Sequence, residues 1–458
     1  MKKRNSFFIS IVMFILHISN GYAQPNSNFT KNDKTVITDK AIFLLHENYV
    51  FPERVEVIEK YIKEKIKNGG YDSLTRLEDF LESLNNDFEE KGKDHHLDIS
   101  YGPARVKQII ADNKNKSEGK EEKTTGEWLQ IIQYENFRLR KVERLDGNIG
   151  YFNFLNFTPL ALSKQSIAAA MNFLLYSNAL IIDLRENGGG YAETMNFILS
   201  YFLPSNSPVS ELRYRNENKL VKTFTVKDKM INKIPNSIPI YILVSKRTSS
   251  AAEAFAYTLQ QYKRATIIGE QTKGEGNPGN LFVINDSLYI MIPTTEAINA
   301  VSKKSIDGIG VIPDIRIEKT NAFTKALIEA NSFLAAKTNN RLLKLLYQWQ
   351  IPFLENELNP HQLAENIITN IVGEYEENRK IIVENGVLYF VNSSGKYNMK
   401  YLGRNTFLVV GKDYRFTFPD FLQPVKSFQV IWNDEGTEEI KRITIKSPTE
   451  KDTLPKNK

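Results

Sequence analysis

The residues best suited to catalysis lie between Ile240 and Ala256, where an apolar strand-like segment leads through a polar turn into a helix that begins with small residues. A serine at a helix start is most simply an N-cap that satisfies free backbone N–H groups. The same position suits a nucleophile, because the helix N-terminus supplies N–H groups for an oxyanion. We therefore expect Ser250 to be a cap or a nucleophile, with Glu253 closing a capping box or bracing the turn.

A second polar turn follows the apolar strand 179–184 and ends in the glycines 188–190, ahead of another helix. Glycines at such a turn let backbone N–H groups converge on an anion, and the helix N-terminus adds partial positive charge. A tight turn that only needs positive φ is the simpler explanation of a glycine triplet. We expect Asp183 and Arg185 to be structural partners that brace this turn.

A serine nucleophile needs a general base, and the chain offers five histidines and no cysteine. His17 lies in the leader described below, whereas His46 and His361 lie in a helix-like segment and a linker. The other two form the segment Asp94-His95-His96. Paired histidines near acids also suit a metal, but without a defined third ligand this is the weaker hypothesis.

The composition indicates a folded, multi-domain protein, since 41% of the 458 residues are hydrophobic. The lack of cysteine excludes disulfide frameworks, thiolate nucleophiles and cysteine-ligated metal sites. Half of the net charge of +6 comes from Lys2, Lys3 and Arg4. What remains is too small, without a basic stripe, to indicate nucleic-acid binding.

Residues 1–23 have the pattern of a secretory signal peptide, with a basic start, an apolar stretch and small residues before the cleavage point. The apolar stretch of about 12 residues is shorter than the roughly 20 that a membrane span needs. We therefore expect export, to the periplasm or the medium, after cleavage near Ala23. No later segment is long and apolar enough to span a membrane.

The remaining chain predicts four regions. Residues 24–93 have apolar side chains at helical spacing and predict a helical subdomain, whereas residues 112–126 lack apolar side chains and predict a mobile excursion. From residue 148 apolar strands alternate with amphipathic helices, which predicts a layered α/β core within residues 94–318. The expected strands are 149–155, 179–184, 238–244 and 265–268, and the expected helices are 162–176, 191–202 and 251–262.

A helical connector over residues 319–360 is expected next, with helices at 322–337 and 341–350. Residues 361–458 show short alternating strands, with Asn385-Gly386 as a tight hairpin turn between two of them. This pattern predicts a small antiparallel β sandwich or barrel as an accessory domain.

Four motifs together resemble the serine peptidases that include the C-terminal processing (tail-specific) peptidases, tricorn and the interphotoreceptor retinoid-binding protein. They are Asp-Leu-Arg-x-Asn-x-Gly-Gly at 183–190, Thr-Ser-Ser-Ala-Ala-Glu at 248–253, Gly-Glu-x-Thr-x-Gly at 269–274 and Gly-Val-Ile-Pro-Asp at 310–314. The resemblance covers about residues 36–318. It implies a crotonase/ClpP-like core and a hydrolase that needs no metal or organic cofactor.

The resemblance also implies roles for single residues. The family's nucleophile maps to Ser250 and not to Ser249, and the backbone N–H groups of Ala251 and of Gly189, or of a neighbouring glycine, are the implied oxyanion donors. One branch of the family takes its base from a lysine. That position holds Glu275 here, although Lys273 stands two residues away and is an alternative base.

The tricorn-like branch takes its base and its acid from positions that hold His96 and Asp307 here. Relatives in that branch have glutamate where Asp307 stands, and Gly or Ser where His95 stands. The chain has no convincing PDZ-like segment, which processing peptidases usually have for binding substrate tails.

We therefore predict an exported serine endopeptidase that hydrolyses peptides or unfolded protein tails through a Ser250 acyl-enzyme, with His96 as general base. The alternative is a non-catalytic peptide- or ligand-binding protein on the same fold, because one relative is a carrier and fold does not fix function. The sequence predicts neither the cleavage preference nor the oligomeric state.

Overall fold

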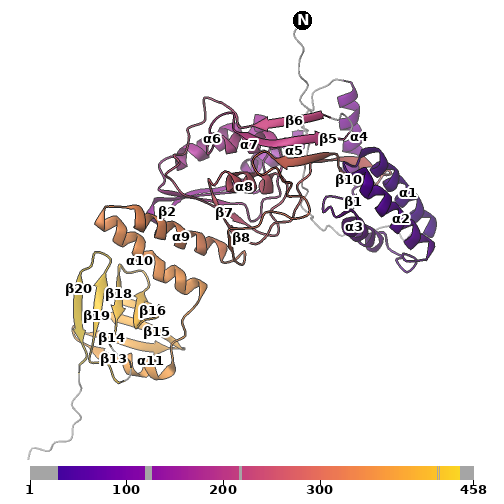
Figure 1. Cartoon of the computed structure of the whole chain (residues 1–458). Helices are drawn as coiled ribbons and strands as arrows, with labels where there is room; N and C mark the ends of the chain where they lie inside the picture. The colour runs from indigo at the N-terminus through magenta and orange to yellow at the C-terminus, as the bar shows by residue number, and fades with distance from the viewer. Residues whose placement is uncertain (1–28, 119–125, 216–218, 420, 422, 444–458) are drawn as a thin grey trace, which may run out of the picture. The chain divides into compact units, whose positions relative to one another are not determined.

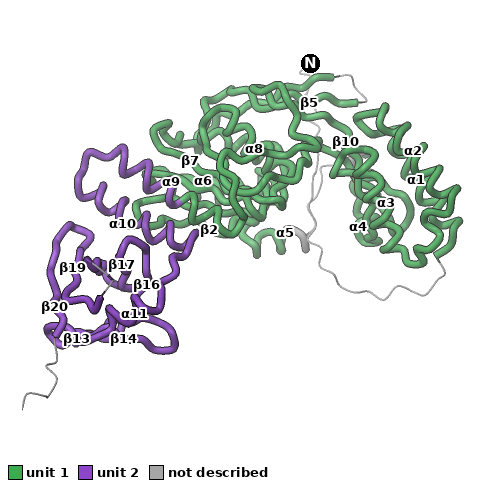
Figure 2. The backbone as a smooth tube through the Cα atoms, turned by 60° about the horizontal axis from the view of Figure 1, so that its bottom comes forward, with its two compact units in different colours: residues 1–326 green, residues 327–458 purple. Residues whose placement is uncertain are grey.

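The computed structural model describes residues 29–118, 126–215, 219–419, 421 and 423–443 (Figure 1). The chain divides into two compact units, residues 1–326 and 327–458, which Figure 2 shows in different colours. The signal peptide predicted at residues 1–23 lies outside the described residues. Among the helices of the described residues, none combines the length and the apolar character that crossing a membrane requires.

Three helices at the start of the first unit pack against a small antiparallel sheet. The helices are α1 (Lys31–Asn48), α2 (Pro52–Lys67) and α3 (Leu77–Gly92), and the sheet has the order β1 (Asp98–Tyr101), β10 (Leu288–Pro293), β9 (Gly279–Val283). Helices and sheet share one apolar core, which includes Leu45, Phe80 and Ile290. Because β1 pairs with β10, the segment just before β1 is held close to a part of the chain that comes far later in the sequence.

Two further helices, α4 (Pro103–Ser117) and α5 (Gly126–Tyr134), precede the main sheet. The prediction of a mobile excursion over residues 112–126 is wrong for residues 112–117, which continue α4. Val106 and Ile109 in the first turns of α4 are buried. Polar and charged residues can continue a helix that is held in this way, because they face the solvent. Residues 119–125 lie outside the described residues.

The main sheet of the first unit has six strands and is mixed. Its order is β12 (Ile315–Arg316), β8 (Thr266–Gly269), β7 (Ile240–Val244), β4 (Ala179–Asp183), β3 (Ile149–Phe154), β2 (Leu139–Leu145). All neighbours run parallel except β2, which is antiparallel to β3. Because β4 and β7 are parallel neighbours, the polar turns at their carboxyl ends lie at the same edge of the sheet.

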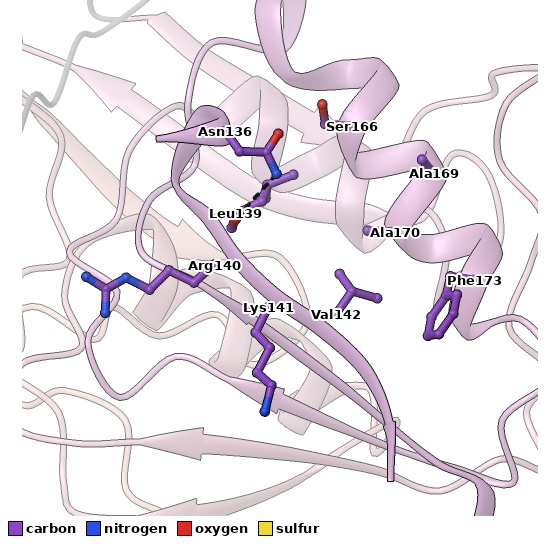
Figure 3. A pocket seen from close by; sticks show the side chains of 9 residues that line it. All are labelled: Asn136, Leu139, Arg140, Lys141, Val142, Ser166, Ala169, Ala170 and Phe173. Atoms are coloured by element: carbon purple, nitrogen blue, oxygen red, sulfur yellow. Dashed lines mark hydrogen bonds between the residues drawn. The ribbon is translucent and has the colours of Figure 1, made fainter. Parts of the chain in front are cut away.

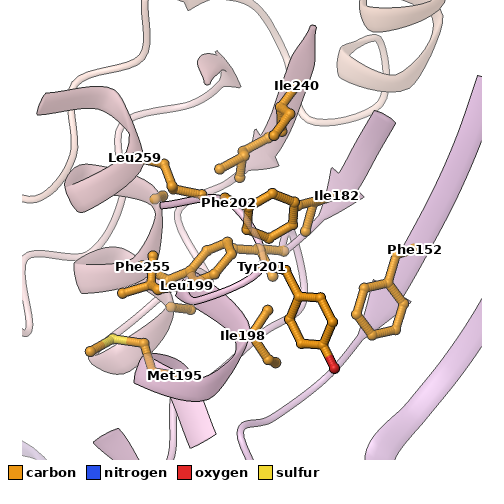
Figure 4. Packing of buried hydrophobic residues seen from close by; sticks show 14 of the residues in the cluster. Phe152, Ile182, Met195, Ile198, Leu199, Tyr201, Phe202, Ile240, Phe255 and Leu259 are labelled. Atoms are coloured by element: carbon orange, nitrogen blue, oxygen red, sulfur yellow. The ribbon is translucent and has the colours of Figure 1, made fainter. Parts of the chain in front are cut away.

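Helices α6 (Leu160–Leu174), α7 (Ala192–Leu199) and α8 (Ala251–Gln261) bury their apolar faces with this sheet. Figure 4 shows Phe255 and Leu259 of α8 packed with Phe202 and Ile240. The predicted strands and helices of the core are confirmed to within a few residues. This packing fixes the direction and depth of α8, the helix that begins after Ser250.

A second three-stranded antiparallel sheet completes the first unit, in the order β11 (Thr295–Asn299), β5 (Pro208–Tyr214), β6 (Lys219–Phe224). Helix α9 (Ala322–Lys337), the first helix predicted for the connector, crosses the boundary between the units.

The second unit contains α10 (Arg341–Leu358), α11 (Glu365–Ile371) and eight antiparallel strands that pair in sequence order. The strands are β13 (Gly373–Tyr375), β14 (Arg379–Glu384), β15 (Val387–Asn392), β16 (Gly395–Tyr401), β17 (Thr406–Val409), β18 (Tyr414–Thr417), β19 (Ser427–Trp432) and β20 (Thr437–Lys441). A bridge between Tyr375 and Arg442 joins the first strand to the end of the last. Of the two predicted forms, the domain is therefore a barrel, and Asn385-Gly386 forms the expected hairpin with positive φ at both residues.

Candidate active site

The turns that follow β4 and β7 are joined by side-chain hydrogen bonds. Thr248 Oγ1 donates to the carbonyl of Leu184 at 2.8 Å, and Ser245 Oγ donates to the carbonyl of Arg185 at 2.6 Å. Arg185 in turn donates from Nε to Asp183 Oδ1 at 2.9 Å, so these two residues brace the turn as predicted. The hydroxyl groups of one polar turn thus fix the position of the other.

Ser250 directly precedes α8 and has φ +55° and ψ −125°. A positive φ in a residue other than glycine is strained, and such strain concentrates at functional sites. The side chain is partly exposed, whereas the neighbouring Ser249 and Ala251 are buried. Ala251 is the first residue of α8, so its N–H belongs to the group that a helix leaves without a partner in the preceding turn.

Glu253 holds the backbone of Ser250 and a second loop together. Its carboxylate accepts hydrogen bonds from Ser250 N at 2.9 Å, Thr272 Oγ1 at 2.5 Å, Gly274 N at 2.7 Å and Glu275 N at 2.9 Å. The side chain is fully buried, and this burial raises the pKa of Glu253 to about 7 against the opposing effect of its donors. Glu253 is therefore a brace behind the nucleophile position.

Gly189 lies against the serine. A Cβ at this position would be 2.7 Å from Ser250 Cβ and 2.9 Å from the carbonyl oxygen of Ser249, and φ is +93°. Only glycine combines this backbone angle with so close an approach. The N–H of Gly189 donates to Asn187 Oδ1 at 2.9 Å within the turn. Gly189 thus lies against Ser250, and its N–H is engaged by Asn187.

A second group of polar side chains lies around His96. One ligand atom each from Asp94, His96 and Asp307 lies within 4.8 Å of the others. Asp94 is fully buried and accepts hydrogen bonds from the backbone N–H of His96 at 2.9 Å and from Tyr49 Oη at 2.9 Å. His96 and Asp307, which are far apart in the sequence, thus lie close together.

Asp307 has an unusual electrostatic environment. Burial, and next the negative charge of Asp94, raise the pKa of Asp307 to about 8. A backbone hydrogen bond from Gly276 N to Asp307 Oδ1, at 3.2 Å, acts in the opposite direction. At neutral pH Asp307 therefore keeps a proton that an ordinary aspartate would have released.

The loop 272–276 connects the two groups. Glu253 holds one end of the loop, and Gly276 at the other end contacts Asp307. The structure contains no hydrogen bond between Ser250 and His96, because both ring nitrogens of His96 are without a partner among the described residues.

The other predicted site residues lie elsewhere. Lys273 Nζ forms an ion pair with Glu275, the residue at the position of the family's lysine. His95 Nδ1 forms an ion pair with Glu89 at 2.7 Å, and about a third of its side chain is exposed. Neither belongs to the cluster around His96.

The sequence did not single out Asp94, Tyr49 or Asn187 as site residues. Asp94 was visible as part of the histidine segment, and its spacing of two from His96 was the available signal. Tyr49 gave no signal, because its contact with Asp94 joins residues that are 45 positions apart in the sequence.

A pocket of about 340 Å³ lies between β2 and α6 (Figure 3). Val142 and Phe173 face each other across it, and Arg140 and Lys141 extend from the strand. None of the predicted site residues lines this pocket.

Comparison with known proteins gives consistent matches. The model of peptidase family S41 matches residues 148–317, and the model of the N-terminal domain of Peptidase_S41 in eukaryotic IRBP matches residues 29–133. A carboxy-terminal-processing protease of Bartonella bacilliformis is 30% identical over 38% of this chain and 40% of its own length. The chloroplastic carboxyl-terminal-processing peptidase 1 of Arabidopsis thaliana is 26% identical over 40% of this chain and 36% of its own length.

Among solved structures, the photosystem II D1 C-terminal processing protease matches 63% of this chain and 93% of its own, at 13% identity and a TM-score of 0.37. The matched part of the present chain thus spans less than half the length of the two curated relatives.

Proposed function

Because the chain belongs to peptidase family S41, we propose that it is a serine-type peptidase that hydrolyses peptide bonds through a Ser250 acyl-enzyme. The observation that carries the proposal is the geometry of Ser250, a strained residue at the N-terminus of α8 with Gly189 against its side chain. We propose peptides or unfolded protein tails as substrates, in keeping with the names of the curated relatives. Export and a crotonase/ClpP-like core belong to the same proposal.

In the proposed mechanism, His96 accepts the proton of Ser250 Oγ while this oxygen attacks the carbonyl carbon of the scissile bond. His96 then donates this proton to the leaving amine, and water attacks the acyl-enzyme by the same route. Asp94, and Asp307 once it has released its proton, stabilise the imidazolium that forms between these steps. The reaction requires a hydrogen bond between Ser250 and His96 to form. Catalytic hydrogen bonds often tighten only in the complex with substrate.

The oxyanion of the tetrahedral intermediate would be bound by the N–H of Ala251 and by that of Gly189 or the neighbouring Gly190. Gly189 N–H first has to exchange Asn187 Oδ1 for the substrate oxygen. One such donor is typically worth about 3 kcal/mol in the transition state.

A fluorophosphonate probe tests the proposal, because it labels only an activated serine. We expect labelling of the wild type, none of Ser250→Ala and almost none of His96→Ala, whereas Lys273→Ala labels normally. The matched control is His95→Ala, which removes the neighbouring exposed histidine and leaves labelling intact. Labelling that depends on Lys273 and not on His96 would assign a lysine base. A folded wild type that never labels would overturn the proposal in favour of a peptide- or ligand-binding protein.

A further inference from the structure

The cluster of Asp94, His96 and Asp307 contains a buried imidazole whose ring nitrogens the described residues leave without hydrogen-bond partners. His96 is only 6% exposed, yet neither of its ring nitrogens has a hydrogen-bond partner in the described part of the chain. A buried polar atom without a partner is destabilising by about 1–3 kcal/mol, so an unsatisfied imidazole calls for an explanation. A ligand that accepts an imidazole lone pair would supply it.

The charge of the cluster points to a cation. Two carboxylates flank His96, and the nearby cation that acts on Asp307 is Arg54. The guanidinium of Arg54 donates to the carbonyl of Gly92 at 3.1 Å, and within the described part of the chain no ion pair joins it to either carboxylate. Two buried carboxyl groups so close together favour the uptake of either a proton or a metal ion.

The donor set selects the type of cation. One imidazole nitrogen and two carboxylate oxygens, all within 4.8 Å of one another, form a compact three-ligand site. Such a mixed nitrogen and oxygen set suits Zn²⁺ with water as a fourth ligand, whereas Ca²⁺ and Mg²⁺ prefer oxygen alone. Asp94 is already oriented by Tyr49 Oη and by the N–H of His96, which is the outer support that metal ligands usually have.

We propose that Asp94, His96 and Asp307 bind one Zn²⁺ ion, and that the bound ion inhibits the peptidase. The inhibition rests on the proposed function, because the metal would occupy the lone pair of His96 that has to accept the Ser250 proton. Zinc is then a reversible inhibitor and not a cofactor, and the metal-free chain is the active form.

Binding is tested first, without reference to activity. The full chain, freed of metal with a chelator, is titrated with Zn²⁺ in a calorimeter, and with Co²⁺ while its visible absorption reports the coordination. We expect one ion per chain for the wild type and for Ser250→Ala. His96→Gln and Asp307→Asn should abolish this binding, and Tyr49→Phe should weaken it by about 10-fold or more.

The matched control is His46→Gln, because His46 also pairs with a carboxylate, Glu59 at 2.7 Å, but on an exposed surface. It should bind Zn²⁺ as the wild type does. Circular dichroism and melting temperature show that each variant is folded. Binding that persists in folded His96→Gln and Asp307→Asn would overturn the metal site.

Inhibition is tested next with the fluorophosphonate probe. The Zn²⁺ concentration that halves labelling of the wild type should match the dissociation constant from calorimetry, and chelator should restore labelling. If the wild type binds Zn²⁺ at the cluster but never labels, the proposed function fails and the metal site stands. If the protein labels and Zn²⁺ at saturation leaves the rate unchanged, the inhibition is wrong.

Discussion

At the scale of single residues, the backbone and side chain of Ser250 are held in place by their neighbours. Its backbone N–H is held by Glu253, its side chain lies against Gly189, and its φ is positive. Each of these restraints can be removed by one substitution.

Gly189→Ala should lower kcat by about 100-fold or more, because the new methyl group would displace Ser250 and a displacement of about 1 Å has this effect. Gly386→Ala is the control, since it also has positive φ (+77°) but no atom within 4 Å of the added Cβ. Hydrolysis of a fluorogenic peptide, with melting temperature alongside, measures both. Equal losses of activity in the two variants would show that the contact between residue 189 and Ser250 is not the cause.

Glu253→Gln should change how stability depends on pH. The pKa of Glu253 is raised from an ordinary 4.5 to about 7, so between these pH values the folded chain keeps a proton that the unfolded chain has released. Stability from this group is therefore complete below about pH 4.5 and is lost as pH rises to about 7, by about 3 kcal/mol in all.

Urea unfolding at pH 5, 6, 7 and 8 measures this effect as the difference between wild type and Glu253→Gln. We expect the variant to be less stable at pH 5, because its amide brings two N–H groups against the surrounding donors where the protonated carboxyl group brings one O–H, and the difference to shrink toward pH 8. A difference that does not change with pH would contradict the assignment.

At the scale of elements, the site depends on which strands are neighbours. The order β8, β7, β4 aligns two polar turns, and the pairing of β1 with β10 fixes the histidine segment near the loop that contains Asp307. The loop 272–276 connects both sides through Thr272, whose Oγ1 donates to Glu253 at 2.5 Å and accepts from Val311 N at 2.6 Å.

Thr272→Val should therefore reduce stability by about 2–3 kcal/mol and reduce activity as well, because it leaves the buried N–H of Val311 without an acceptor. Thr272→Ser keeps the hydroxyl and should retain most of both properties. Urea unfolding and peptide hydrolysis measure the two effects. If Thr272→Ser loses as much activity as Thr272→Val, the hydrogen bonds of the Thr272 hydroxyl are not the cause of the loss.

The same scale explains what the sequence could predict. Core strands such as 179–184 and helices such as 251–262 were predictable because their apolar period is local. The two three-stranded sheets were not, since β1 pairs with β10 across most of the first unit and no local pattern encodes that pairing. Ser250, His96 and Asp307 came from the resemblance, and Asp94 and Tyr49 needed the tertiary contacts.

At the scale of the whole molecule, the two units have separate apolar cores. The barrel core is rich in aromatic pairs, such as Phe416 with Phe428 at 4.5 Å between ring centroids. Each unit should therefore unfold in its own transition.

Arg442→Ala tests this independence. Arg442 donates to the carbonyls of Asn370 at 2.9 Å and Val372 at 2.6 Å, next to its bridge with Tyr375. The loss of Arg442 should lower the free energy of unfolding of the second unit by about 2–3 kcal/mol. One calorimetric transition should then move to lower temperature, and fluorophosphonate labelling of Ser250 should stay unchanged. Lys380→Ala, which removes only an exposed ion pair with Glu374, is the control and should change neither. A simultaneous shift of both transitions would show that the units unfold together.

The bridge that closes the barrel also determines where its chain can be cut. Because β13 and the end of β20 are hydrogen-bonded neighbours, the barrel enters and leaves at one seam. A short linker across that seam would allow new termini at the turn 385–386, where both residues are exposed. The barrel is thus suited to circular permutation, and to insertion as a module into a loop of another protein.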